Sequence, residues 1–163
     1  MIEADEFLEP AFRQGFNFYT GVPCSFLTPL INRAIDAPRI NYVGATSEGE
    51  AVAIAAGAWL AGRQAVVMGQ NSGLGNMVNP LTSLSHPFRI PVLLIVTWRG
   101  RPGLGDEPQH EVMGRIIGDL LETLNIDHRP FPMSPDEVAP ALDAARAAFK
   151  QSSLPFALIM EKG

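Results

Sequence analysis

The chain has 163 residues, of which 47% are hydrophobic and 18% charged, and its formal net charge is −5. This length and composition predict one globular domain with a sizeable core, and the lack of a basic stripe argues against nucleic-acid binding. Cys24 is the single cysteine, which excludes an intramolecular disulfide and favours a reducing compartment, the cytoplasm. We expect neither a signal peptide, because the N-terminus is acidic, nor a membrane span, because no uncharged apolar run reaches roughly 18 residues.

Short apolar runs alternate with helical stretches along the chain. The expected helices cover residues 2–14, 25–35, 48–61, 74–86, 111–124 and 135–150. The expected strands cover residues 16–20, 40–44, 64–69, 91–98 and 155–160, with a weaker one at 127–131. This alternation predicts a three-layer α/β fold, a doubly wound and mainly parallel sheet with helices on both faces, formed by residues 1–163 as a single domain.

Ligands of such sheets bind at the carboxyl ends of the strands, where polar loops of this chain would gather. The stretch QNSGLGN (70–76) is expected to be a glycine-rich turn before its helix. It is either a tight turn or an anion cradle, but it has no lysine and no complete nucleotide-binding pattern. Its amide and hydroxyl groups suit hydrogen bonds to a neutral heterocycle or a carbonyl.

Two further loops carry candidate chemistry. In GVPCS (21–25), Cys24 or Ser25 is either a nucleophile or, more simply, a packed thiol and a helix N-cap; Ser134 is a second expected N-cap. The loop 98–110 is either a solvated surface loop or an anion-recognition site built on its arginines, with a histidine as a proton shuttle. No histidine has metal-ligand spacing to another ligand, so no metal site within this chain is expected.

The stretch TSEGEAVAIAAGAWLAG (46–62) predicts a helix that has acids at its start and almost no polar stripe. A helix that is apolar all round must be covered on every side. The sheet covers one side, and we expect a subunit interface to cover the other. The small residues expected to allow close approach there are Ala51, Ala55, Ala56, Gly57 and Ala58.

Four segments, in this order, resemble the pyrimidine-binding domain of thiamine-diphosphate-dependent 2-oxoacid decarboxylases. They are GVPCSFL (21–27), SEGEAVAIAAG (47–57), QNSGLGNMVNPLTSL (70–84) and WRGRPGLGDEPQH (98–110). The resemblance runs from Gly15 to about Ile126 and is greatest to the phosphonopyruvate decarboxylases, with the α subunits of sulfopyruvate decarboxylases as close relatives.

This resemblance implies that Glu48, rather than Glu50, is catalytic: its carboxyl group hydrogen-bonds N1′ of the aminopyrimidine and so promotes deprotonation of the thiazolium ring. It also implies that Gln70, Asn71 and Ser72 bind the cofactor. Glu50 keeps the simpler interpretation of a first-turn acid that favours the helix dipole.

Around the substrate, the resemblance implies contacts from Ser25 and Asn71, and a catalytic role in proton transfer for His110. Arg99 and Arg101 are expected to bind the phosphonate or sulfonate, on the basis of their charge and placement.

The diphosphate and its Mg²⁺ are held in this family by a second domain with a Gly-Asp-Gly motif, which this sequence lacks. We therefore expect a separate β subunit to carry that domain, in an α₂β₂ or higher assembly. The implied activity is that of a carbon–carbon lyase that decarboxylates 3-phosphonopyruvate to phosphonoacetaldehyde. The alternatives are sulfopyruvate decarboxylation, a non-catalytic subunit with the same fold, and a nucleotide-binding doubly wound domain.

Overall fold

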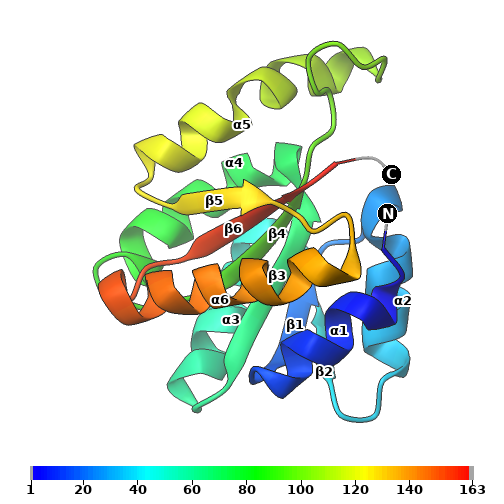
Figure 1. Ribbon diagram of the computed structural model, residues 1–163. Coiled ribbons are helices and arrows are strands. Elements are labelled where there is room, and N and C mark those ends of the chain that lie inside the picture. Colours follow the sequence, from blue (N-terminus) through cyan, green and yellow to red (C-terminus); the bar gives the residue numbers. More distant parts are fainter. Residues whose placement is uncertain (1, 162–163) are drawn as a thin grey trace.

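The computed structural model describes residues 2–161 (Figure 1). The helices are α1 (Ala4–Arg13), α2 (Thr28–Asp36), α3 (Glu48–Leu60), α4 (Asn71–Pro80), α5 (Glu111–Thr123) and α6 (Pro135–Ser152). The strands are β1 (Phe16–Gly21), β2 (Asn41–Gly44), β3 (Gln64–Gln70), β4 (Leu93–Thr97), β5 (Asp127–Pro130) and β6 (Phe156–Met160). Shorter helical turns are η1 (Ser25–Leu27), η2 (Leu81–Ser85) and η3 (Pro108–His110).

The strands form one six-stranded sheet in the order β2-β1-β3-β4-β6-β5. Every pairing is parallel, with Val66 opposite Leu93 and Leu93 opposite Phe156 at the centre. The predicted doubly wound parallel sheet is therefore confirmed, including the short strand at 127–130.

Helices cover both faces of the sheet and produce two separate cores (Figure 1). One core joins α1, α2 and α6 to the face that carries Leu93 and Ile95. The other joins α3, α4 and α5 to the face that carries Leu94 and Val96. Every residue of β4 is buried, in keeping with its apolar run from Leu93 to Val96, and the buried Thr97 ends the strand. Among the helices of residues 2–161, none combines the length and the apolar character needed to cross a membrane.

The order of the strands reverses between β1 and β3, because β1 is followed by β2 on one side and by β3 on the other. In doubly wound sheets, the crevice at the carboxyl ends of such a pair is the usual ligand site. Here GVPCS leaves β1 and Gln70 ends β3, so two of the candidate loops meet at this crevice.

The glycine-rich turn expected at 70–76 is wrong: α4 begins at Asn71, directly after the extended residue Gln70. The glycines lie within the helix, and Gly73 provides space there for a neighbouring side chain. Of the two expected serine caps, Ser25 is wrong, because it lies inside η1, before the Pro29-containing first turn of α2. Ser134 does occupy the N-cap position of α6, but its side chain makes no capping hydrogen bond.

The expectation that a partner subunit covers the small residues of α3 is largely wrong. Ala51, Ala55 and Ala56 are buried within this chain, because α4 packs on α3 and supplies the second layer. The outward side of α3 carries Ala53, Gly57 and Leu60, and the Leu60 side chain is 72% exposed. Of the small residues predicted to form an interface, only Gly57 is exposed.

Candidate functional site

The carboxyl ends of β1, β3 and β4 bring three side chains into contact. The thiol of Cys24 lies 3.5 Å from Oε1 of Gln70 and 3.7 Å from Oγ1 of Thr97. Cys24 and Thr97 are buried, whereas the adjacent Ser25 is exposed. Ser25 therefore lies at the rim of this contact, where its hydroxyl is accessible.

Gln70 links the loop after β1 to the start of α5. Its side-chain amide nitrogen donates a 2.7 Å hydrogen bond to Oγ of Ser72 and lies 3.5 Å from Nδ1 of His110. His110 is buried, with 7% of its surface exposed, although it lies 40 residues from Gln70 in sequence. The structure thus brings together Gln70, Ser72 and His110, three of the residues that the sequence indicated.

Glu48 is the first residue of α3, and its carboxylate extends across to α4. Oε2 accepts a 2.9 Å hydrogen bond from Nδ2 of Asn76. The side chain occupies a niche that exists because residue 73 is glycine, since an added Cβ at Gly73 would overlap the Glu48 carboxyl group. A second glycine, Gly69, borders the same side chain, with its Cβ position 3.3 Å from Cγ of Glu48.

Glu50 has a different environment from Glu48, although both begin the same helix. Its carboxylate accepts 2.6 Å hydrogen bonds from both the backbone N–H and the hydroxyl of Thr46. The hydroxyl and N–H of Thr46 lower the pKa of this exposed carboxyl group. Ser47 caps the helix by accepting a hydrogen bond from the Glu50 N–H. Glu50 therefore stabilises the start of α3 and does not extend toward α4.

Asn71 is fully buried and uses both ends of its amide group on the backbone of Arg99. Its Nδ2 donates to the Arg99 carbonyl at 2.7 Å, and its Oδ1 accepts from the Arg99 N–H at 3.3 Å. The side chain therefore anchors the loop after β4, a task that the sequence did not indicate.

Arg99 forms a bidentate ion pair with Asp106. Its Nε and Nη2 donate to the carboxylate at 2.8 and 2.5 Å, and each side chain is 16% exposed. The guanidinium also lies over the ring of Phe26, 4.8 Å from the centroid. Its charge is thus already matched by a carboxylate of the same chain.

Arg101 is likewise paired, with the Glu161 carboxylate, and its guanidinium lies 5.1 Å from the Trp98 ring centroid. Its side chain is 39% exposed, more than that of Arg99. A substrate anion that approached either arginine would therefore compete with a resident carboxylate.

The pairing of Asp106 predicts a pH dependence of stability. The hydrogen bond from Arg99, supported by the N–H groups of Gly100 and Glu107, holds the pKa of Asp106 well below its usual 3.8. Because this pKa is lower in the folded state, the stabilisation is complete above about pH 5 and is lost as the pH falls below about 4. Asp106→Asn should therefore lower Tm by a constant amount above about pH 5 and by a shrinking amount in more acid solution. Thermal unfolding of both proteins across this range is the measurement, and a Tm difference that does not shrink in acid would contradict the assignment.

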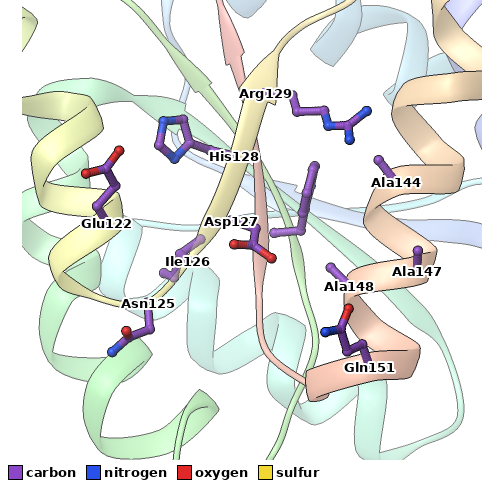
Figure 2. A pocket seen from close by; sticks show the side chains of 11 residues that line it. Glu122, Asn125, Ile126, Asp127, His128, Arg129, Ala144, Ala147, Ala148 and Gln151 are labelled. Carbon is purple, nitrogen blue, oxygen red and sulfur yellow. The ribbon is translucent and has the colours of Figure 1, made fainter.

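The cavity in Figure 2 lies apart from these residues. Its volume is about 630 Å³, and it opens between α5, β5 and α6, with Asp127, Arg129 and Phe156 in its lining. Asn125, Ile126 and Asp127 precede or begin β5, so the cavity lies at the amino ends of the outer strands. None of the predicted site residues lines it. Parallel sheets bind their ligands at the opposite ends of the strands.

Residues 2–161 contain no group of three or more His, Cys, Asp or Glu side chains placed to hold a metal ion. Two sets of polar groups lie at the carboxyl ends of the strands: the Glu48 carboxylate with Asn76, and the Gln70 amide with the Ser72 hydroxyl. Their hydrogen-bonding capacity suits an uncharged heterocycle. The Glu48 carboxylate has acceptor capacity beyond its bond from Asn76, since an ionised carboxylate offers about four lone-pair sites. These residues fit the aminopyrimidine of thiamine diphosphate.

Three residues that shape the site were missed by the sequence analysis: Thr97, Asn76 as a partner of Glu48, and Asp106. Asn76 follows Gly73 by three positions, so once α4 is known to begin at Asn71 both lie on the side of the helix that faces Glu48. Asp106 had no sequence signal beyond its place in a polar loop, because its partners are set by the path of that loop.

Comparison with known proteins identifies relatives along the whole chain. A family model described as "Thiamine pyrophosphate enzyme, N-terminal TPP binding domain" matches residues 4–128. Over 163 residues the chain is 50% identical to a phosphonopyruvate decarboxylase of Streptomyces viridochromogenes and 48% identical to one of Streptomyces hygroscopicus. Each match covers 100% of this chain but 41% of the relative, so the chain spans about two fifths of the length of these relatives.

A shorter relative is the sulfopyruvate decarboxylase subunit alpha of Methanothermobacter thermautotrophicus, 42% identical over 123 residues, which is 76% of this chain and 73% of that protein. Among solved structures, benzoylformate decarboxylase of Polynucleobacter necessarius has a TM-score of 0.76 at 21% identity, covering 97% of this chain and 29% of that one. A 2-oxoglutarate:ferredoxin oxidoreductase of Magnetococcus marinus has a TM-score of 0.72 at 17% identity, covering 99% and 29%. At these identities the two structures show a shared fold.

Proposed function

The chain belongs to the thiamine pyrophosphate enzymes, as a member of their N-terminal TPP-binding domain family, and from this premise we propose that it is the pyrimidine-binding part of a decarboxylase that converts 3-phosphonopyruvate to phosphonoacetaldehyde and CO₂. The observation that carries the proposal is the 50% and 48% identity to two phosphonopyruvate decarboxylases over the full chain. Two sets of polar contacts at this end of the sheet support it: Gln70 with Ser72 and His110, and Glu48 with Asn76.

In this proposal Glu48 is the residue that hydrogen-bonds the aminopyrimidine. Thiamine diphosphate, when bound, supplies the electron sink for the loss of CO₂. Glu48 is the first residue of α3, and the Asn76 amide donates a hydrogen bond to one of its carboxylate oxygens. The other oxygen remains to hold a proton against N1′. Gln70 and Ser72, which are already bonded to each other, would orient the ring from the side of β3.

The substrate would lie between the rim residue Ser25 and His110. We propose that His110 moves a proton or contacts the substrate, since it is the one histidine at this end of the sheet that contacts Gln70. Of the arginines, Arg101 is the better candidate for the phosphonate, because it is more exposed than Arg99. Arg99 and Asn71 would act on the substrate through the loop that they hold.

The remaining parts of the enzyme would come from a domain outside this chain. We propose that this complementary domain, on a β subunit, binds the diphosphate and Mg²⁺, and that the minimal assembly is α₂β₂. Relatives named as subunit alpha support this, because matches to this chain cover 73%, 87% and 85% of three of them. The proposed compartment is the cytoplasm, in keeping with a single, buried, free cysteine.

Sulfopyruvate decarboxylation is the alternative, favoured by the 42% identity to a sulfopyruvate decarboxylase subunit alpha. The two substrates differ in charge, because a phosphonate can carry a second negative charge near neutral pH and a sulfonate cannot. The enzyme should therefore distinguish the two substrates through the cationic side chain that binds the phosphonate or sulfonate group.

The test is an assay of the complete enzyme, this chain together with its diphosphate-binding domain, on both substrates. We expect kcat/KM for phosphonopyruvate to exceed that for sulfopyruvate by at least about tenfold, the discrimination that one added charge contact typically provides. The matched control is pyruvate, which has no second anion and should react more slowly than either. A higher kcat/KM on sulfopyruvate would overturn the proposed substrate and leave the cofactor assignment intact.

A further inference from the structure

We propose that Asp106 is a positioning residue for His110: it holds the loop 98–110 in the path that delivers the His110 ring to Gln70. The inference rests on the proposed function for its effect on turnover, but its structural part concerns this chain alone. The residues around Asp106 are exposed, although its own side chain is 16% exposed, so polar bonds rather than a buried apolar core hold this part of the loop.

The Asp106 carboxylate gathers N–H donors from three residues. It accepts from Arg99 Nε at 2.8 Å and Nη2 at 2.5 Å, from the Gly100 N–H at 2.8 Å and from the Glu107 N–H at 2.8 Å. A carboxylate bonded by a guanidinium fork and two backbone N–H groups is among the stronger polar anchors that a loop can have. The Asp106 side chain thus connects the later part of the loop to Arg99 and Gly100 near its start.

The beginning of the loop is itself fixed to the body of the protein. The buried amide of Asn71 bonds both the N–H and the carbonyl of Arg99, and Trp98 Nε1 donates to the Gly114 carbonyl at 2.7 Å. Arg99 therefore has its backbone held by α4 and its side chain held by Asp106. Through it, Asp106 is tied to the carboxyl edge of the sheet.

The end of the loop is reached through two short connections. Gly100, whose N–H binds Asp106, has φ of +71° and packs so closely on His110 that an added Cβ would overlap the His110 carbonyl. Glu107, whose N–H also binds Asp106, accepts a 2.9 Å hydrogen bond from the His110 N–H on its carbonyl. Gly100 and Glu107 both contact the His110 backbone, and the N–H group of each donates to the Asp106 carboxylate.

These contacts hold the backbone of His110, and Nδ1 of its ring lies 3.5 Å from the side-chain amide nitrogen of Gln70. The ion pair with Asp106 also explains the role of Arg99. Although this cation lies at the edge of the site, its charge is used to stabilise the loop. Because Arg99 keeps the pKa of Asp106 low, the anchor stays ionised throughout the pH range in which the enzyme would work.

The test compares Asp106→Asn with Glu107→Gln, which removes one negative charge from the next residue, whose side chain makes no hydrogen bond to the loop. In the complete enzyme, Asp106→Asn should lower kcat by about 10- to 100-fold with little change in KM, since small misplacements of a reacting group have effects of this size. Glu107→Gln should leave kcat within about twofold. In a His110→Ala background, Asp106→Asn should cost nothing further, because the two changes remove one function.

A second readout needs neither substrate nor partner. The chain has three histidines, so their ring proton NMR signals can be assigned with His110→Ala and His128→Ala. Asp106→Asn should shift or broaden the His110 signal and leave those of His86 and His128 in place. Asp106→Glu, which keeps the charge but moves the carboxylate by one methylene, is the second variant should Asp106→Asn not fold, and should change the same signal.

The results that overturn the inference are specific. An unchanged His110 signal in both Asp106 variants would show that the carboxylate does not position this ring, whatever the activity. Additive losses of kcat in the double variant would assign Asp106 a role independent of His110. A changed His110 signal in an enzyme with no decarboxylase activity would leave the positioning intact and refute the proposed function instead.

Discussion

Glu48→Gln is expected to lower kcat on the preferred substrate by about 10² to 10⁴-fold, the usual contribution of a positioned proton-transfer group. Glutamine has the same shape and keeps an oxygen that can accept the Asn76 hydrogen bond of 2.9 Å. Under the proposed mechanism, what it loses is the ability to hold a proton against the aminopyrimidine. The fold and the assembly should therefore be unchanged, and only the chemistry should suffer.

The measurement is steady-state kinetics, paired with thermal unfolding with and without thiamine diphosphate. A ligand that binds the folded state raises Tm by an amount that grows with the logarithm of its concentration relative to Kd, so a retained Tm increase in Glu48→Gln would separate lost chemistry from lost binding. Glu50→Gln is the matched control, because Glu50 is exposed and bonds Thr46 at the start of the same helix. It should retain activity and lose a little stability.

Two outcomes distinguish the remaining alternatives. Normal turnover by Glu48→Gln would mean that the thiamine mechanism is wrong for this chain. Absence of turnover in the wild-type assembly, with a Tm that does not respond to thiamine diphosphate, would favour the non-catalytic subunit.

The strands of the sheet were predictable because each is determined largely by its own local sequence. The run PVLLIVTW (91–98) reads as a strand from its own composition, and β4 lies within it, buried along its full length. Alternation with helical stretches then fixes a parallel sheet. The weak strand expected at 127–131 also forms, as β5, because it pairs with the outer edge of β6.

The start of α4 was not predictable from local propensity. Glycine is among the weakest helix formers, so QNSGLGN favours a turn on its own. The helix forms there because α3 packs against it, and Gly49 approaches so closely that its Cβ position lies 3.0 Å from the Asn76 carbonyl. Tertiary packing overrides propensity: Gly49 lets α3 approach α4, and Gly73, one of the glycines that argued against a helix, leaves room for the Glu48 side chain.

The charges of the loop 98–110 were predictable, but their partners were not. Arg99 and Arg101 follow a buried strand, which places them at the ligand end of the sheet. Pairing depends on how the loop folds back, and this brings Asp106 to Arg99 across seven positions and Glu161 to Arg101 across 60. Sequence therefore located the cations but overstated their freedom to bind an anion.

Gly73→Ala carries the second large expected effect, since it acts on the Glu48 niche without changing any charged or polar group. An alanine methyl at this position would overlap the carboxyl group of Glu48, so the carboxylate must move away from α4 and from the Asn76 amide. A displacement of about 1 Å at a catalytic group can cost about 10²-fold in rate. We expect kcat to fall by about 10- to 100-fold.

The same helix offers a matched control in Gly75→Ala. Gly75 is exposed, and a Cβ there would meet nothing within 4 Å. Both variants gain the helix propensity of alanine, about 0.5–1 kcal/mol, but only Gly73→Ala disturbs Glu48. Gly75→Ala should therefore raise Tm and keep kcat, whereas Gly73→Ala should lower kcat with a smaller gain or a loss in Tm. Equal kcat values for the two variants would show that the carboxylate has freedom to relocate without penalty, and the niche would then have no part in catalysis.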